Sequence, residues 1–356
     1  MLVWKNILRK RRFILSEISS FSLLKSAVYH GEFDKSSLIR LLENRKLLNR
    51  VVRLAEINGL YYLFITNLKE MGLDLTTSER FSCESVRLEE FKRTLKLLNE
   101  VSNQNKIDHI LIKSCIDVSH VPRDVDVLIH GDEKEAFIEA LLERGFKSVY
   151  QTDVETALSK DGYLKIDIYI ETRYLDYTFL NEPFLWNSIV KANIFDEDHW
   201  VLNNEVNLLL LMVHGIFGHR NITFLDYIQI SYILPNVELA TCKNYVNENG
   251  WIQTFNIIYN EFNKIKYKVD SSSPDLYFPY KFNQKFILKL INSLNKKPIT
   301  IKFLFFLYIS LFIDGLIYEL KKYDIYNYLL KCSYIRIAFN SFNYFIRHSV
   351  GDTKSK

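Results

Sequence analysis

Two aspartates stand two residues apart in an apolar stretch, Pro122 to Ile129, whose sequence is PRDVDVLI. Residues two apart on a β-strand point to the same face, so Asp124 and Asp126 are expected to project together. Neighbouring carboxylates repel each other, and a cation between them relieves that repulsion. Mg²⁺ is typically held by one or two carboxylates together with substrate phosphates. By itself such a pair is more often only the solvated face of a strand, and a site for Mg²⁺ or Mn²⁺ is the alternative.

A third aspartate strengthens the metal interpretation. Asp167 lies in the later stretch KIDIYI, where Ile166 and Ile168 flank it as valines flank the first pair. This alternation predicts a second half-buried strand with its carboxylate on one face. Four other aspartates stand in loop-like context and are interpreted as turn or surface residues: Asp132, Asp153, Asp161 and Asp176.

The elements around these aspartates have strand and helix periods in a compact order. Lys134 to Arg144 is predicted to be an amphipathic helix that ends at Gly145. Asp161-Gly162 indicates a hairpin turn. Three stretches are predicted to be neighbouring strands of one sheet: Ile107 to Lys113, Arg123 to Ile129 and Tyr163 to Ile170. Two further short strands are predicted at Phe146 to Tyr150 and Thr156 to Ser159.

The flanking regions have helical periods. We expect an N-terminal helical region over residues 1–103, an α/β core over 104–172 and a C-terminal helical region over 173–356. Helices are predicted at Glu205 to Phe217 and at Thr223 to Leu234, the second with a capping box formed by Thr223 and Asp226. The fold class is thus α+β, with a small mixed sheet flanked by N- and C-terminal α-helical regions.

Two histidines follow the apolar run that starts near Leu208. On an unbroken α-helix His214 and His219 would be about 140° apart, so they could not hold one ion together. A buried, hydrogen-bonded His214 is the plainer interpretation.

Composition excludes several classes of protein. The 356 residues include only 11 Gly and 6 Pro, which favours helices, and the formal net charge of +4 does not by itself indicate nucleic-acid binding. The four cysteines, widely spaced, predict neither a disulfide framework nor a zinc knuckle. No P-loop, zincin or serine-hydrolase motif occurs. Basic residues that could face RNA, although a solvated surface is the commoner reading, are Arg9 to Arg12, Arg336, Arg347 and Lys354.

The sequence predicts a cytoplasmic protein without a membrane segment. The longest apolar run, Phe303 to Ile313, has 11 residues, whereas a bilayer span needs about 20. No signal peptide is expected, because Arg9 to Arg12 follow a short mixed start and no long apolar stretch comes after them.

From about residue 38 to residue 235 the chain resembles the DNA polymerase β superfamily of nucleotidyltransferases, and within it an uncharacterised branch with helical flanks. The resemblance rests on the strand ILIK followed by Ser114, on Arg123 with the Asp-x-Asp strand, and on the later Asp167. Leu208 to His214, His219 and Leu225-Asp226 look like the helical element that follows in that branch. The helices expected from Leu41 to Met71 also suit its N-terminal half.

The resemblance implies transfer of a nucleoside monophosphate from an NTP to an acceptor hydroxyl, with release of pyrophosphate. Asp124, Asp126 and Asp167 would hold Mg²⁺ or Mn²⁺, and Asp167 would also orient or deprotonate the acceptor. Lys113 and Ser114 would touch phosphates, and Arg123 would neutralise the leaving group. The acceptor could be RNA, a protein hydroxyl or a small molecule. His214, His219 and Asp226 would contact the nucleotide or support the site.

One departure from the family pattern supports a rival function. The family has a glycine after the first strand, which lets the backbone approach a phosphate closely. This chain has Ser114 and Cys115 there. The missing glycine favours a non-catalytic nucleotide-binding or interaction module on the same fold. Retention of all three aspartates favours the enzyme.

Overall fold

The computed structural model describes residues 20–30, 39, 41, 43–113, 120–174, 177–219, 221–271, 278–282 and 284–293. Several sequence predictions fall on residues outside these ranges: Ser114, Cys115, Arg9 to Arg12, Phe303 to Ile313, Arg336, Arg347 and Lys354. Among the described residues, no helix combines the length and the apolar character needed to cross a bilayer.

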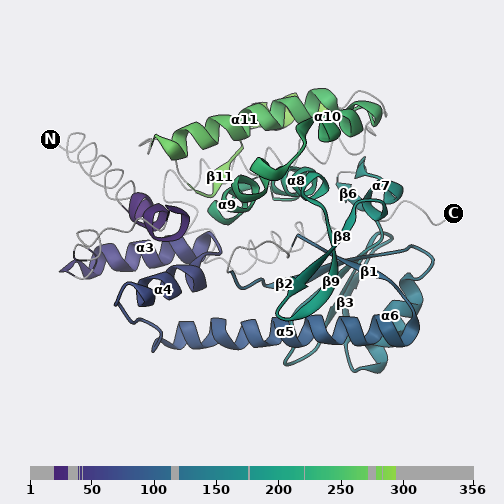
Figure 1. Ribbon diagram of the computed structural model, residues 1–356, viewed down its shortest axis with the longest axis horizontal. Helices are drawn as coiled ribbons and strands as arrows, with labels where there is room; N and C mark the ends of the chain where they lie inside the picture. The colour runs from purple at the N-terminus through teal and green to yellow at the C-terminus, as the bar shows by residue number, and fades with distance from the viewer. Residues whose placement is uncertain are drawn as a thin grey trace, which may run out of the picture.

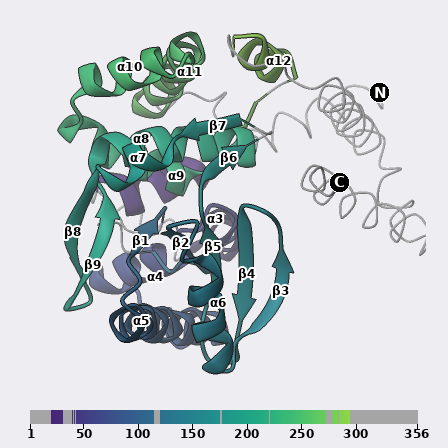
Figure 2. The same ribbon diagram turned by 90° about the vertical axis from the view of Figure 1, so that its right-hand side faces the viewer.

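A seven-stranded mixed sheet forms the centre of the molecule, with strand order β3-β4-β5-β2-β1-β9-β8 (Figure 2). Its strands are β1 (His109–Ile112), β2 (Asp124–Ile129), β3 (Lys147–Gln151), β4 (Glu155–Ser159), β5 (Lys165–Tyr169), β8 (Ile189–Ile194) and β9 (Glu197–Leu202). The prediction that three stretches form neighbouring strands is confirmed, because β5, β2 and β1 are adjacent. β1 and β2 are antiparallel, whereas β2 and β5 are parallel.

The two faces of the sheet pack against different helices. Val125 and Val127 of β2 belong to an apolar cluster with α5 (Glu79–Asn105) and α6 (Lys134–Glu143). Ile110, Ile112 and Leu128 face the other way and join a second apolar cluster, built largely from the remaining helices. The sheet therefore lies between α5 on one side and α8 and α9 on the other (Figure 1). The aspartates of β2 alternate with its valines and share the second face.

Helices before and after the sheet pack into that second cluster together. They are α3 (Arg45–Ile57), α4 (Tyr61–Glu70), α8 (Asn204–Val213), α9 (Phe224–Ile233), α10 (Leu239–Glu248), α11 (Ile252–Asp270) and α12 (Gln284–Asn292). A buried hydrogen bond joins the two groups, because the Phe224 N–H donates to Asn58 Oδ1 at 2.9 Å. Shorter elements are η1 (Ser26–His30), α7 (Glu182–Trp186), η2 (His214–Gly218), η3 (Leu234–Asn236), the hairpin β6 (Thr172–Tyr174)–β7 (Tyr177–Leu180) and the antiparallel strand pair β10 (Asn221–Ile222) and β11 (Tyr280–Lys281).

The prediction of helices from Arg173 onward is wrong for its first thirty or so residues. Strands β6 to β9 lie there, and β9 extends the central sheet by pairing in parallel with β1. The reason is that β8 is an edge strand with no clean alternation: Val190 is exposed beside the exposed Lys191. An edge strand with such irregular burial carries a weak periodic signal.

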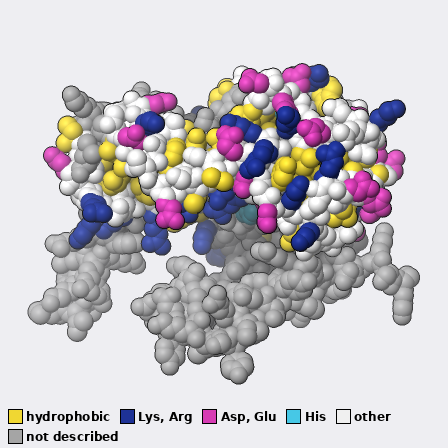
Figure 3. Space-filling model, turned by 90° about the horizontal axis from the view of Figure 1, so that it is seen from below, with side chains coloured by type: hydrophobic (Ala, Val, Ile, Leu, Met, Phe, Trp, Pro, Cys, Tyr) yellow, Lys and Arg dark blue, Asp and Glu magenta, His cyan; other side chains and the backbone are white. Residues whose placement is uncertain are grey.

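Charges of both signs are mixed over the described surface that carries α5 (Figure 3). On α5, Arg87 pairs with Glu84 at 2.8 Å and Lys92 pairs with Glu89 at 2.7 Å. The exposed Lys92–Glu89 pair contributes little to stability, whereas the Glu84 carboxylate is only 8% exposed. This face thus balances its charge locally.

Two histidines are buried side by side between the sheet and α5. His109 of β1 and His199 of β9 each stand two residues before the paired residues Leu111 and Val201. His109 Nδ1 hydrogen-bonds Ser102 Oγ at 2.6 Å. Its Nε2 atom and both ring nitrogens of His199 have no hydrogen-bond partner among the described residues. Burial lowers the pKa of His109 to about 4, with a further contribution from His199, and burial also lowers the pKa of His199.

Acid should therefore weaken the fold through His109. Since its folded pKa lies below the ordinary 6.5, the unfolded chain binds more protons, and stability present above pH 6.5 is lost as the pH falls toward 4. At about 1.4 kcal/mol per pKa unit the full loss is about 3 kcal/mol. In urea unfolding at pH 7 and pH 5, His109→Leu should show a smaller difference between the two pH values than the wild type. An unchanged difference in His109→Leu would refute this role.

Candidate functional site

The pairing of β2 with β5 brings the three predicted aspartates to one face of the sheet. In this parallel register Asp126 lies opposite Asp167, and Asp124 lies opposite Lys165. Residues directly opposite each other in neighbouring strands share a face. Asp124 and Asp126 share it because they are two residues apart. The face is the one turned away from α5 and α6.

Two lysine ammonium groups lie among these carboxylates. Lys113 Nζ is 2.9 Å from Asp126 Oδ1, and both side chains are largely buried. Lys165 Nζ is 2.6 Å from Asp167 Oδ2 and 3.5 Å from Asp124 Oδ2. As they stand, no three His, Cys, Asp or Glu side chains among the described residues are grouped closely enough to hold a metal ion. The repulsion that the sequence indicated is thus offset by lysines.

One oxygen of the cluster remains unpaired. Asp167 Oδ1 is buried and has no hydrogen-bond partner among the described residues, although Oδ2 of the same carboxylate binds Lys165. A buried oxygen without a partner is costly, and such groups in native proteins commonly mark a functional site or a bound ion. The Asp167 side chain is only 6% exposed, so bulk solvent does not satisfy it.

Burial and mutual repulsion shift the carboxylates in the same direction. Burial raises the pKa of Asp167 to about 6; the hydrogen bond and charge of Lys165 oppose this rise, whereas Asp126 and Asp124 add to it. Burial and the charge of Asp126 raise the pKa of Asp124 against the opposing charges of Lys165 and Lys113. Carboxylates perturbed by burial together with specific charges are typical of functional sites.

Lys113 is held from several sides at the end of β1. Its backbone has φ +63°, in the left-handed region that few residues other than glycine adopt. Its ammonium lies 4.3 Å from the centroid of the Tyr169 ring, a cation–π contact. Glu155 Oε1 accepts hydrogen bonds from the hydroxyls of Tyr169, at 2.9 Å, and of Tyr150. This tyrosine–glutamate network could not be predicted from the sequence, because its members come from three strands.

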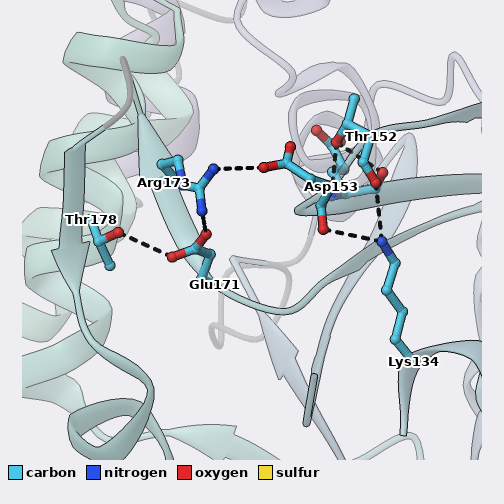
Figure 4. Close-up of polar contacts among 7 residues, drawn as sticks. Lys134, Thr152, Asp153, Glu171, Arg173 and Thr178 are labelled. Atoms are coloured by element: carbon cyan, nitrogen blue, oxygen red, sulfur yellow. Dashed lines mark hydrogen bonds and ion pairs between the residues drawn. The ribbon is translucent and has the colours of Figure 1, made fainter. Parts of the chain in front are cut away.

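A second polar network fixes the chain where it leaves β5. Arg173 binds Asp153 at 2.8 Å and also pairs with Glu171, which accepts a 3.0 Å hydrogen bond from Thr178 Oγ1 (Figure 4). Lys134 is buried and donates to the carbonyl oxygens of Thr152, at 3.1 Å, and of Asp153, at 3.3 Å. The interpretation of Asp153 as an ordinary turn residue missed this role. The network ties the β6–β7 hairpin to the β3–β4 turn.

The two histidines after α8 differ from their expected arrangement. The chain changes there from an α-helix to a π-helical turn, His214–Gly218, in which the His219 N–H donates to the His214 carbonyl at 3.1 Å. This i→i+5 turn brings the two residues to the same side of the helix, and their rings meet edge to face with centroids 4.4 Å apart. The separation of about 140° derived from an unbroken helix is therefore wrong.

The charge of Lys113 affects the pKa of His214. Burial lowers the pKa of His214 well below 6.5, and the positive charge of Lys113 and the neighbouring His219 lower it further. His214 is therefore neutral near neutral pH and can exchange hydrogen bonds without adding positive charge. The C-terminal helices thus contribute a side chain next to the strand cluster.

The remaining predicted site residues have different positions. Arg123 is exposed at the start of β2 and makes no ion pair with another described residue. Asp226 forms the predicted capping box: its Oδ2 accepts from the N–H and the hydroxyl of Thr223, each at 2.7 Å. The structure therefore gives Asp226 a part in starting α9, and among the described residues no hydrogen bond or ion pair joins it to the aspartate cluster. Ser114 lies outside the described residues.

Comparisons with known proteins give a likeness of fold only. No protein-family model and no curated protein matches the chain. Among solved structures it is similar to the lincosamide antibiotic adenylyltransferase LnuA bound to lincomycin, at 17% identity and a TM-score of 0.31 over 40% of this chain and 94% of that one. It is also similar to the antibiotic-resistance factor ANT(2'')-Ia, at 8% identity and 0.34 over 49% and 96%.

A third similar structure is an antigenic nucleotidyltransferase-like protein from Paracoccidioides brasiliensis, at 15% identity and a TM-score of 0.29 over 42% of this chain and 77% of that one. All three likenesses cover less than half of the chain. The fold is α+β with a central mixed sheet, as predicted.

The Lys113–Asp126 pair should be strongly coupled. Removing one partner of a buried pair leaves an uncompensated charge, which typically costs about 3–5 kcal/mol, whereas removing both costs less. In urea unfolding, Lys113→Met and Asp126→Asn should each lower the free energy of unfolding. The sum of the two losses should exceed the loss measured for the double variant. The same cycle on Lys191 and Asp198, which are 3.4 Å apart but about 60% exposed, should give a coupling below about 1 kcal/mol. Equal coupling in the two cycles would contradict the buried role of Lys113.

Proposed function

We propose that the protein is a metal-dependent nucleotidyltransferase that transfers a nucleoside monophosphate from an NTP to an acceptor hydroxyl and releases pyrophosphate. The observation that carries this proposal is the in-register pairing of Asp126 with Asp167, beside Asp124 on the same face. Three carboxylates of this kind are costly to gather unless they bind something positive. Two lysines beside them suit a substrate that brings several negative charges.

The cluster fits a hard divalent cation in its chemistry. All candidate ligands are carboxylate oxygens, which Mg²⁺ and Mn²⁺ prefer, and Asp167 Oδ1 is buried without a partner among the described residues. Asp124, Asp126 and Asp167 would hold Mg²⁺ or Mn²⁺. When bound, such ions neutralise charge on the phosphates and align the attacking and leaving oxygens.

The side chains of the chain divide the remaining work. The acceptor oxygen forms a bond to the α-phosphorus while the bond from that phosphorus to the bridging oxygen of pyrophosphate breaks. Asp167 takes the proton of the acceptor hydroxyl, because its Oδ1 atom has no hydrogen-bond partner among the described residues. Lys113 and Ser114 bind phosphate oxygens, and Arg123 neutralises the departing pyrophosphate. His214, which is neutral and near Lys113, offers a hydrogen bond to the nucleotide.

Labelled nucleotides test the reaction directly. The protein should transfer label from one of the four α-³²P NTPs, with Mg²⁺ present, to a component of a cell extract; the labelled product would show whether the acceptor is RNA, a protein hydroxyl or a small molecule. Asp167→Asn should lower the rate by about 100-fold or more, as when one preorganised group that stabilises charge is removed. Asp198→Asn, an exposed aspartate of β9, should keep the rate. Full activity in Asp167→Asn would overturn the assigned mechanism.

Thermal unfolding distinguishes the enzyme from a non-catalytic module. A ligand at 100 times its dissociation constant stabilises a protein by about 2.7 kcal/mol, so a non-hydrolysable NTP analogue with Mg²⁺ should raise Tm by several degrees. The rise should be smaller without Mg²⁺ and absent in Asp126→Asn, whereas Asp198→Asn should show the full rise. A protein indifferent to every analogue, with or without Mg²⁺, would instead be an interaction module.

A further inference from the structure

Lys165 occupies the position that a cation bound to the aspartates would need. It stands on β5 two residues before Asp167, on the same face, and its ammonium touches one oxygen each of Asp167 and Asp124. A divalent cation on those oxygens would meet the ammonium at short range, and like charges repel. The lysine and the cation therefore compete for the same two carboxylates.

The two lysines of the site differ in how firmly they are held. Lys113 is 9% exposed, binds Asp126 and lies against the Tyr169 ring, whose hydroxyl is fixed by Glu155. Lys165 is 35% exposed, so its flexible four-carbon stem can move into solvent. Lys165, unlike Lys113, is therefore exposed enough to move away from the carboxylates that it binds.

A triphosphate offers Lys165 a new partner. Lysine binds phosphate as a point charge, and a nucleotide held over this face would bring several negative oxygens near β5. We propose that Lys165 exchanges partners, binding Asp124 and Asp167 before the nucleotide arrives and the nucleotide phosphates afterwards. The carboxylates become free for the divalent cation only in the second state. This inference rests on the proposed nucleotidyltransferase function and adds an order of binding to it.

The exchange predicts a reciprocal coupling between the cation and the nucleotide. If the nucleotide draws Lys165 away and so raises the affinity for the cation, the cation must raise the affinity for the nucleotide by the same factor. Without the ammonium, the cation no longer competes with it and the nucleotide loses one contact. The coupling that remains in such a variant is the direct attraction between cation and phosphate.

Mn²⁺ binding, followed by electron paramagnetic resonance, tests the exchange without any turnover. Free Mn²⁺ is titrated into the wild type, Lys165→Met, Lys165→Arg and Lys191→Met, each with and without a non-hydrolysable NTP analogue. Without the analogue, Lys165→Met should bind Mn²⁺ about tenfold more tightly than the wild type, a coupling of ordinary size. Lys165→Arg, which keeps the charge, and Lys191→Met, at an exposed site, should resemble the wild type. The analogue should enhance Mn²⁺ binding less in Lys165→Met than in the wild type.

The outcomes separate this inference from the function on which it rests. Equal Mn²⁺ affinity of the wild type and Lys165→Met in the absence of the analogue would overturn the exchange and leave the proposed function standing. Failure of both proteins to bind Mn²⁺, even with the analogue, would overturn both. Lys165→Gln provides the same comparison if Lys165→Met does not give the wild-type circular dichroism spectrum.

Discussion

The in-register parallel pairing of β2 with β5 is the constraint on which the site depends. Because side chains alternate along a strand, a slip of one residue would move Asp167 to the face that packs on α5 and α6. Val125, Val127, Ile166 and Ile168 prevent that slip, since each is fully buried on that face. Burying an aliphatic side chain of this size contributes about 1.5–3 kcal/mol. The apolar face of the sheet therefore fixes the positions of the carboxylates on the other face.

Charge balance is the second condition that the site satisfies. Three buried or half-buried aspartates face two lysines. Lys165 lies on β5 together with Asp167, and Lys113 follows β1, which pairs with the strand that carries the other two aspartates. Such an arrangement is stable without a ligand, yet it leaves Asp167 Oδ1 unpaired. A cluster selected only for stability would satisfy this oxygen, because well-satisfied networks are more stable than partly satisfied ones. The unpaired oxygen thus favours a binding role.

Local alternation made the sheet and its acidic face predictable. Strands β1, β2 and β5 lie where their period of two placed them, and the capping box of Thr223 and Asp226 forms as its residue types indicated. The partners of the lysines were not predictable, because the positions of long side chains depend on strands that are distant in sequence. The π-helical turn at His214 was not predictable from a period of 3.6 residues. The β8–β9 hairpin was missed because its outer strand, β8, has no regular alternation of buried and exposed residues.

That hairpin explains how a helix outside the sheet contributes to the site. β9 pairs with β1, whose last residue precedes Lys113. It then leads through Asn203 directly into α8, where the Asn203 side chain accepts from the Val206 N–H at 3.1 Å and fixes the start of the helix. α8 is buried along its length and ends in the π-helical turn that carries His214. The strand that pairs with β1 therefore also leads through α8 to His214, and only Asn203 separates the strand from the helix. A site assembled from regular elements in this way holds its geometry more firmly than one built on loops.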